Sequence, residues 1–368
     1  MDIQLNIGII GAGGFAAFAS KSFLQIPGIN IIAVTDINRS AAEKMAKELD
    51  AELYTDLNSF FQNDKIDLVY IATPPFLHFE QSKKALLAGK HVICEKPAAL
   101  KTIEVEELQE LARTMNLLYV VNLMQRYNPL YNIVTTIVKE KMLGNFLHGF
   151  FENYASDETL GIDHWFWDKS KSGGIFIEHG VHFFDMFSGW LGKGEVLNSV
   201  QLQRKGTKDL LDRVHATVIY PAGIVNFYHG FDQPSILDRQ EIRLQFEKGE
   251  ITLYEWVPVK MKLHGLFETS QVKKLYELLN DFSIFHHTET TKKIVKGRFA
   301  EIRFDEHITI EYGNISDKQN RYKEILIAML EDQCKWIRDR THTRVIDDNN
   351  ALESLRIAEK ATLIAQVF

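Results

Sequence analysis

Short, nearly continuous apolar runs alternate with amphipathic stretches through the first third of the chain. Such runs are typical of strands buried on both faces of a parallel sheet, and the stretches between them have the period of helices. The predicted strands are Leu5–Ile10, Ile29–Thr35, Leu68–Ala72, His91–Cys94 and Leu117–Leu123, and the helices between them include Ser40–Leu49 and Glu80–Ala88. This alternation predicts a doubly wound parallel sheet, with ligands at the carboxyl ends of its strands.

A glycine-rich turn joins the first predicted strand to the first helix. Residues 11–16, Gly-Ala-Gly-Gly-Phe-Ala, follow the strand directly and have the spacing G-x-G-x-x-A. Gly11 permits the tight turn, Gly13 lets a pyrophosphate approach the backbone, and Ala16 keeps the helix close to the strand. With Gly14 and Phe15, these residues form the predicted cofactor-binding turn, because a helix N-terminus offers N–H groups to phosphates.

Asp36 ends the second predicted strand, twenty-five residues after Gly11. A carboxylate at this place accepts the ribose hydroxyls of NAD and repels the 2′-phosphate of NADP, so NAD is the expected cofactor and NADP the alternative. Arg39 lies close enough to keep that alternative open. The other interpretation of Asp36 is a cap for the helix that starts near Arg39.

The second half of the chain has a different hydrophobic pattern, in which apolar and polar positions alternate. The predicted strands are Phe146–Tyr154, Glu195–Arg204, Arg213–Tyr220, Ile224–Gly230, Glu241–Phe246 and Glu250–Trp256. Gly-containing turns separate several of them, which predicts a largely antiparallel sheet with helices on one face. The open face is expected to carry five aromatic residues, Phe227, Tyr228, Phe246, Tyr254 and Trp256, and aromatic residues in strands are also ordinary core material.

The expected fold class is therefore α/β, with an N-terminal Rossmann domain and a C-terminal α+β domain. The first domain spans residues 1–122 and binds NAD(P) on a doubly wound parallel sheet. The second spans residues 123–368 and has a large, mainly antiparallel, open-faced sheet. Within it, the segment 260–312 predicts a helix over 270–280 and a strand over 301–312, and the pair His286-His287 before Thr288 is interpreted as a solvated turn.

Two predicted strands of the first domain end in turns that carry candidate site residues. Thr73, Pro74 and His78 follow the strand 68–72, and Glu95-Lys96-Pro97 follows the strand 91–94. Proline cannot continue either strand, so both segments mark turns at the expected cofactor edge. At this edge, Lys96 is placed to meet a substrate oxygen. The alternative interpretation is a surface lysine with no role in a site.

The stretch 172–185, SGGIFIEHGVHFFD, concentrates titratable side chains within a few residues. On a helix, Glu178 and His182 are four residues apart and His182 and Asp185 three, so each pair is able to touch. A carboxylate beside an imidazole holds one tautomer and tunes a base near neutral pH. A half-buried core histidine remains the alternative.

Together these motifs resemble the family of NAD(P)-dependent sugar oxidoreductases that includes glucose–fructose oxidoreductase and inositol dehydrogenase. The turn 11–16, Asp36, the turn 72–78, Glu95-Lys96-Pro97 and the stretch 172–185 occur in the family's order, and the helix predicted over 351–365 resembles the family's closing helix, which is expected to pack back on the first domain. The resemblance implies that Lys96 polarises the reacting hydroxyl and that His182 accepts its proton. Glu178 stands where the family commonly has Asp, and His179 replaces an apolar residue.

Candidate substrate contacts lie in two other segments. Arg126, in the crossing to the second domain, is either a substrate contact, as the resemblance implies, or an interdomain salt bridge. His164 and Trp165 lie in a loop whose aromatic and polar groups suit a sugar, and His179 is grouped with them. A metal set of His164, Glu178, His179 and His182 is set aside, because neighbouring helical residues diverge by about 100°, and no metal is expected.

Composition narrows the remaining function classes. The chain has 368 residues, a net charge of −7 and two distant cysteines, which favour two domains and a reducing compartment and disfavour nucleic-acid binding. The N-terminus has no signal-peptide pattern, and no apolar run is long enough to span a bilayer. A cytoplasmic homodimer or homotetramer that assembles through the open sheet face, as in the family that the chain resembles, is expected.

These observations predict an NAD(P)-dependent enzyme that oxidises a CH–OH group of a sugar, polyol or related compound. Lys96 orients the hydroxyl, His182 is the acid/base, and Glu178 tunes His182. One alternative is a glycoside lyase or hydrolase in which tightly bound NAD is reduced and restored in each cycle. Another is a non-catalytic regulator that responds to NAD.

Overall fold

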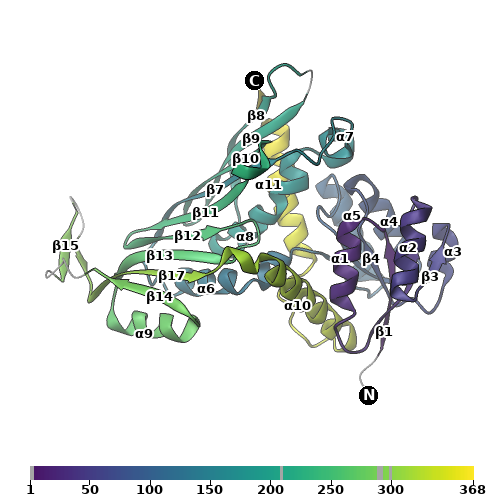
Figure 1. The fold of residues 1–368 in the computed structure, drawn as a ribbon, viewed down its shortest axis with the longest axis horizontal. Coiled ribbons are helices and arrows are strands. Elements are labelled where there is room, and N and C mark those ends of the chain that lie inside the picture. Colours follow the sequence, from purple (N-terminus) through teal and green to yellow (C-terminus); the bar gives the residue numbers. More distant parts are fainter. Residues whose placement is uncertain (1–3, 208–209, 288–292, 298–300) are drawn as a thin grey trace. The chain divides into compact units, whose positions relative to one another are not determined.

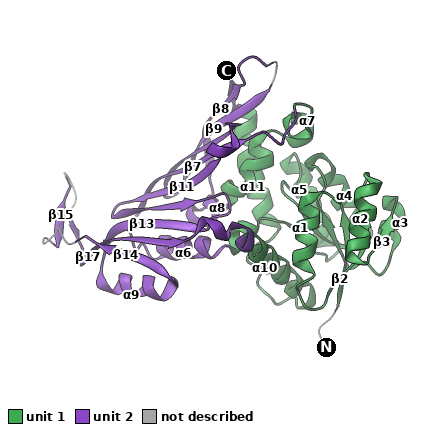
Figure 2. Ribbon diagram, in the orientation of Figure 1, with its two compact units in different colours: residues 1–127, 162–185, 322–363 green, residues 128–161, 186–321, 364–368 purple. Residues whose placement is uncertain are grey.

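The computed structural model describes residues 4–207, 210–287, 293–297 and 301–368, which form two compact units. Unit 1 comprises residues 1–127, 162–185 and 322–363, and unit 2 comprises residues 128–161, 186–321 and 364–368 (Figure 2). Within the described ranges, no helix combines the length and the apolar character that a membrane crossing requires.

A six-stranded sheet forms the centre of unit 1, and all of its neighbouring strands are parallel (Figure 1). Its order is β3-β2-β1-β4-β5-β6, with β1 (Leu5–Ile10), β2 (Ile29–Thr35), β3 (Glu52–Tyr54), β4 (Leu68–Ile71), β5 (His91–Cys94) and β6 (Tyr119–Val121). The order reverses between β1 and β4, and ligands of doubly wound sheets bind at that reversal. The prediction of a Rossmann sheet is confirmed.

The helices follow the strands as the apolar periodicity indicates, with additions. They are α1 (Gly14–Phe23), α2 (Arg39–Leu49), α3 (Leu57–Gln62), α4 (His78–Leu87), α5 (Thr102–Thr114), α6 (Pro129–Lys139), α7 (Lys169–Ser172), α8 (Val181–Leu191), α9 (Thr269–Leu278), α10 (Lys318–Arg338) and α11 (Asp348–Ile364). The long helix α10 was not among the predicted elements. Its Tyr322 ring lies 5.1 Å from that of Phe18 on α1, within unit 1.

A ten-stranded sheet forms unit 2. Its order is β14-β17-β13-β12-β11-β7-β10-β9-β8-β18. The strands are β7 (Phe146–Ser156), β8 (Glu195–Gln203), β9 (Leu211–Tyr220), β10 (Gly223–Gln233), β11 (Arg239–Phe246), β12 (Gly249–Tyr254), β13 (Lys260–Phe267), β14 (Phe282–His286), β17 (Glu306–Gly313) and β18 (Gln366–Val367). Only the pairs β7/β10 and β8/β18 are parallel among these described strands, so the prediction of a mainly antiparallel sheet is confirmed.

The two faces of this sheet differ in burial. Phe187 of α8 packs edge-on against Phe227 of β10, with ring centroids 5.1 Å apart. Phe227 and Phe246 are buried, so the expectation that they lie on the open face is wrong for these two residues. Tyr228 and Tyr254 are half-buried. They lie on the opposite face of the sheet from the buried residues next to them, because successive side chains of a strand point to opposite faces.

The predicted strand over 301–312 is in fact two strands. Glu301–Arg303 forms β16, which pairs with β15 (Ile294–Lys296) in a separate two-stranded sheet. Phe304, which is buried, and Asp305, which is exposed, separate it from β17, which joins the large sheet between β13 and β14. The segment 260–312, whose role was open in sequence, therefore supplies the last three strands at one side of the large sheet, β13, β17 and β14, of which β14 is the edge strand.

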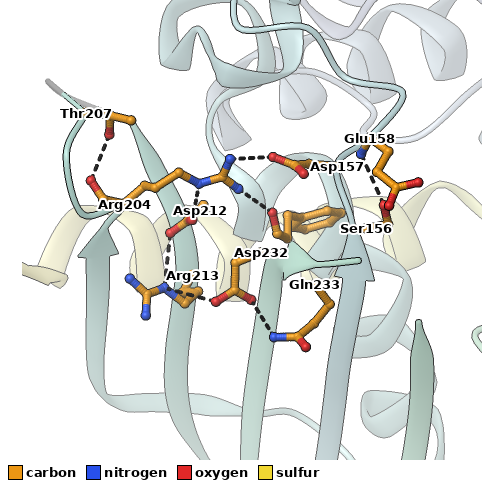
Figure 3. Close-up of polar contacts among 10 residues, drawn as sticks. Ser156, Asp157, Glu158, Arg204, Thr207, Asp212, Arg213, Asp232 and Gln233 are labelled. Atoms are coloured by element: carbon orange, nitrogen blue, oxygen red, sulfur yellow. Dashed lines mark hydrogen bonds and ion pairs between the residues drawn. The ribbon is translucent and has the colours of Figure 1, made fainter. Parts of the chain in front are cut away.

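A charged network ties strand ends together in unit 2 (Figure 3). Buried Asp212 accepts from Arg204 Nε at 2.6 Å and from Arg213 Nε at 3.1 Å. Arg204 also pairs with Asp157 at 2.5 Å, and Arg213 Nε lies 3.7 Å from Asp232. Two guanidinium groups thus compensate the buried carboxylate.

Candidate active site

The turn after β1 has the backbone that the glycine spacing predicts. Gly11 has φ +105°, and a Cβ there would lie 2.4 Å from the carbonyl oxygen of Ala72, so no other residue fits. At Gly13 and Gly14, by contrast, a Cβ would meet nothing within 4 Å. Gly13 caps the start of α1, so its surroundings leave room for an anionic group at the helix N-terminus.

Asp36 lies beside this turn. Its Oδ2 accepts a hydrogen bond from Ala12 N–H at 2.6 Å, and its Oδ1 accepts one from Asn38 N–H at 2.6 Å. The cap of α2 is Asn38, whose side chain accepts from Ala41 N–H, so the capping interpretation of Asp36 is wrong. The carboxylate is thereby held at the glycine-rich turn.

His78 joins the two turns that follow β4 and β5. Its Nδ1 lies 2.6 Å from the carbonyl oxygen of Pro97, and its Nε2 lies 2.7 Å from that of Thr73. The ring is fully buried, and that burial lowers its pKa. Thr73 also donates to Gln81 at 2.6 Å, and Pro74 precedes the short helix 75–77. His78 therefore acts as a brace between the turns.

Glu95 turns its carboxylate into unit 1. Its Oε1 accepts from Tyr70 Oη and, at 2.7 Å, from Asn122 Nδ2. Burial raises the pKa of Glu95. Sequence reasoning did not identify Tyr70 and Asn122 as partners, although the position of Asn122 directly after β6 was the available signal.

Lys96 is fixed by Glu178. Its Nζ donates to Glu178 Oε1 at 2.5 Å and to the Glu178 carbonyl oxygen at 2.9 Å. Both side chains are largely enclosed, with 20% and 12% of their surface exposed. The structure shows the Glu178 carboxylate bound to Lys96, and the contact of Glu178 with His182 stays a prediction.

Glu178 lies in a π-helical turn, 176–180, that precedes α8. Such turns change the direction of side chains and occur often at functional sites. His182 follows on the first turn of α8 and is buried. Burial, with a contribution from the Lys96 charge, lowers the pKa of His182 to about 3, so the ring is neutral at physiological pH.

Asp185 and Arg126 form a buried ion pair within unit 1. Arg126 Nε donates to Oδ2 at 2.7 Å, and its Nη2 donates to Oδ1 at 2.8 Å. The fork geometry accounts for the pairing, and since both residues belong to one unit, the pair is no interdomain bridge. The predicted contact of Asp185 with His182 stays a prediction beside this pair.

The other candidate substrate residues lie nearby in sequence and also belong to unit 1. His164 caps the short helix 165–167 by accepting from Phe166 N–H at 3.2 Å, and its ring centroid lies 5.0 Å from that of Trp165. His179 has its ring 5.3 Å from Phe183. Among the residues that the structure describes, those of the metal set considered above form no group that could hold an ion.

Comparison with family models identifies both halves of the chain. Residues 5–123 match the model described as "Oxidoreductase family, NAD-binding Rossmann fold". Residues 132–252 match the "GFO/IDH/MocA C-terminal domain".

Two curated relatives come from bacteria. The scyllo-inositol 2-dehydrogenase (NAD(+)) of Bacillus subtilis is 26% identical over 221 residues, which are 57% of this chain and 63% of that protein. The 2,7-anhydro-N-acetylneuraminate hydratase of Mediterraneibacter gnavus is 26% identical over 177 residues, 48% of this chain and 46% of that protein. The chain spans 52% to 67% of the length of four of the curated relatives that it matches.

A solved structure covers nearly the whole chain. The WlbA dehydrogenase from Bordetella pertussis, in complex with NADH and UDP-GlcNAcA, superimposes with a TM-score of 0.79 at 15% identity, over 99% of this chain and 96% of that one. This likeness establishes the shared fold. With the family models it confirms the resemblance drawn from the motifs: the chain belongs to the GFO/IDH/MocA family of NAD-binding oxidoreductases.

Proposed function

We propose that the protein oxidises a CH–OH group of a sugar, polyol or related compound in a nicotinamide-dependent reaction. The observation that carries this proposal is the enclosed Lys96 ammonium, held at 2.5 Å by Glu178 beside the carboxyl ends of the unit 1 strands. A fixed cation at this edge is suited to bind and polarise a hydroxyl oxygen.

The residues at the strand ends fit a dinucleotide. The turn Gly11–Ala16 would receive the pyrophosphate, because the space around Gly13 and Gly14 admits a close approach. Asp36 would accept the ribose hydroxyls and disfavour a 2′-phosphate, which makes NAD the preferred cofactor and NADP the alternative. Thr73, Pro74, His78 and Glu95 shape the turns on which the nicotinamide half would rest. When bound, the nicotinamide supplies the acceptor for the hydride of the substrate carbon.

Lys96 orients the substrate hydroxyl and lowers the cost of its deprotonation. Glu178 positions the ammonium through its carboxylate and its carbonyl oxygen, so its role runs through Lys96. Glu178 has one methylene more than an aspartate, so its carboxylate extends about 1 Å further from the backbone. This distance is enough to reposition a catalytic group.

His182 accepts the hydroxyl proton. Its lowered pKa leaves the ring neutral, so a nitrogen lone pair is available across the physiological range. Arg126, His164, Trp165 and His179 are proposed to contact the substrate, and the loop carrying His164 and Trp165 suits the stacking of a sugar ring.

The test is absorbance at 340 nm with purified protein, NAD or NADP, and a panel of sugars, polyols and glycosides. Reduced cofactor should accumulate with wild type, far more slowly with Lys96→Ala and His182→Ala, and normally with the control variants Lys84→Ala and His148→Ala. Lys84 is exposed on α4 and His148 lies on β7, outside the proposed machinery. Equal rates in Lys96→Ala and wild type would contradict the proposal.

A second candidate is suggested by the relative that is a hydratase. Here NAD would be reduced and restored within one catalytic cycle, and the net reaction would be elimination, hydration or glycoside cleavage. Product formation without any accumulation of reduced cofactor would favour this candidate. Binding of NAD with no product from any compound, and normal function of Lys96→Ala, would favour a non-catalytic regulator.

We further infer that the chain forms a homodimer or homotetramer through the open sheet face of unit 2 and resides in the cytoplasm. The open face carries Tyr154, Tyr228 and Tyr254, and both cysteines are buried and free, as in a reducing compartment. The division at residue 122 between a cofactor domain and a substrate domain belongs to the same proposal. Light scattering and cell fractionation test these points.

A further inference from the structure

Three histidines meet at one end of the unit 2 sheet. His264 lies on β13, His307 on β17, and His287 directly follows β14. These strands are neighbours in the order β14-β17-β13, as Figure 1 also shows. His287 N–H donates to the carbonyl oxygen of His307 at 2.9 Å, so the pairing of β14 with β17 continues through it.

The strand register places all three rings on one face. His264 is opposite Thr309, two residues from His307, and Phe285 is also opposite Thr309, two residues from His287. Residues two apart share a face, and this face is the half-exposed one, since the intervening Leu263, Ile308 and Ile310 are buried.

The three rings form a compact cluster in which His287 and His307 are stacked. His264 Nε2 lies 2.8 Å from His307 Nε2, and the ring centroids of His287 and His307 are 4.2 Å apart. One nitrogen from each of the three lies within 4.8 Å of one from the others. In the described part of the chain, this is the one group of histidine, cysteine and acidic residues with that geometry.

We propose that His264, His287 and His307 bind a divalent transition metal ion of the zinc class. Three imidazole nitrogens form a common donor set for zinc, and a water molecule completes the tetrahedron. Ligand nitrogens at about 2.1 Å from one ion are about 3.4 Å apart, so small ring rotations bring this set into place.

Neighbouring groups favour such an ion. Glu250 is paired with His264 across the strands, and its Oε1 lies 3.9 Å from His264 Nδ1, on the side away from His307. Thr309 Oγ1 lies 2.9 Å from His287 Nε2 and holds that ring. A carboxylate beside a ligand imidazole is a common second layer of zinc sites.

A bound ion would link three strands whose connections are long in sequence. His264 and His287 are separated by helix α9, and His287 and His307 by a segment that contains the small β15/β16 sheet. The site lies wholly in unit 2, and none of its residues belongs to the proposed oxidoreductase machinery. The ion is therefore expected to stabilise this end of the sheet and to leave the turnover at Lys96 unchanged.

The test is metal binding by the full-length protein after removal of any affinity tag. Calorimetry with Zn²⁺ and the visible spectrum with Co²⁺ should show one tetrahedral site per chain, and Mg²⁺ should not bind there. Each of His264→Ala, His287→Ala and His307→Ala should lower the Zn²⁺ affinity about 100-fold or more, because loss of even an outer-layer partner costs about 10- to 100-fold.

His286→Ala is the matched control. His286 is one residue from His287, is opposite buried Ile308 rather than His307, and its Nδ1 lies 3.3 Å from Glu306. This variant should bind Zn²⁺ as wild type does. The proposal is overturned if wild type gives no tetrahedral Co²⁺ spectrum, a measurement that needs no variant. It is also overturned if the variant lacking all three histidines retains the affinity, or if His286→Ala loses as much as His287→Ala.

Discussion

The Lys96 cluster of unit 1 and the histidine cluster of unit 2 place similar side chains in opposite surroundings. Lys96, Glu178 and His182 are enclosed. Lys96 and Glu178 form an ion pair, and burial keeps the His182 ring neutral. His264, His287 and His307 lie half-exposed on a sheet face and contact mainly one another. Enclosure suits a group that must act on one bound substrate, whereas an accessible set of lone pairs suits an ion that arrives from solvent.

Replacing Lys96 should have the largest effect. Lys96→Ala removes the cation that polarises the hydroxyl and leaves the Glu178 carboxylate enclosed without its partner, so kcat should fall about 10³- to 10⁴-fold. Steady-state kinetics at 340 nm measure the change. In Glu178→Gln, kcat should fall less than in Lys96→Ala, because the backbone carbonyl oxygen of residue 178 still accepts a hydrogen bond from Lys96 Nζ. If KM rises in Lys96→Ala and kcat is unchanged, Lys96 contributes to substrate binding and not to the chemical step.

Breaking the buried ion pair of unit 1 should cost stability. Arg126→Met leaves the Asp185 carboxylate, which is 1% exposed on its side chain, without the guanidinium, and the free energy of unfolding should fall by about 3–5 kcal/mol. Urea denaturation followed by circular dichroism measures this loss. Arg126→Lys should recover part of the stability, because it restores the charge without the fork. A change below about 0.5 kcal/mol would show that the pair contributes little.

Zinc should stabilise the second cluster alone. At Zn²⁺ concentrations about 100 times its dissociation constant, binding should add about 2.7 kcal/mol to the stability of unit 2. The unfolding temperature of wild type should rise on adding Zn²⁺ and fall again with a chelator, while His307→Ala should not respond. The turnover of wild type should be the same in both conditions. A chelator that abolishes turnover would place a metal in the oxidoreductase site.

The two clusters also differ in what the sequence reveals of them. The Rossmann sheet, the turn 11–16 and the importance of the segment around Glu178 were predictable, because strand-to-helix transitions and glycine spacings are local signals. The partner of Glu178 was not, because Lys96 lies 82 residues away and the π-helical turn changes the direction of the side chain. His264, His287 and His307 come together only through strand register, which a single sequence does not define, and His287 was therefore assigned to a solvated turn; Thr288 lies outside the described residues.

Acid should destabilise both units through their buried histidines. Burial lowers the pKa of His182 in unit 1 and of His229 in unit 2 to about 3. Between the ordinary pKa of about 6.5 and these values, the unfolded chain binds protons that the folded chain does not. Stability is therefore full above about pH 6.5 and falls by about 1.4 kcal/mol per pH unit for each such histidine as the pH decreases.

Urea unfolding at a series of pH values checks this dependence. His182→Gln and His229→Gln should each flatten the decline, and exposed His286→Ala should not. A profile that is unchanged in both glutamine variants would mean that neither histidine is kept neutral by folding.

Cofactor choice should show the smallest effect. Half-buried Asp36 accepts hydrogen bonds from Ala12 and Asn38, so it is fixed at the turn while its carboxylate remains accessible to a ribose. Asp36→Asn keeps the size and removes the charge, so kcat/KM for NAD should fall about 10-fold, the loss of one charged hydrogen bond, while kcat/KM for NADP rises. Asp50→Asn is the control, since Asp50 is exposed at the far end of α2. If the ratio of the two kcat/KM values stays constant in Asp36→Asn, Asp36 shapes the turn without selecting the cofactor, and discrimination against the 2′-phosphate has to come from another side chain.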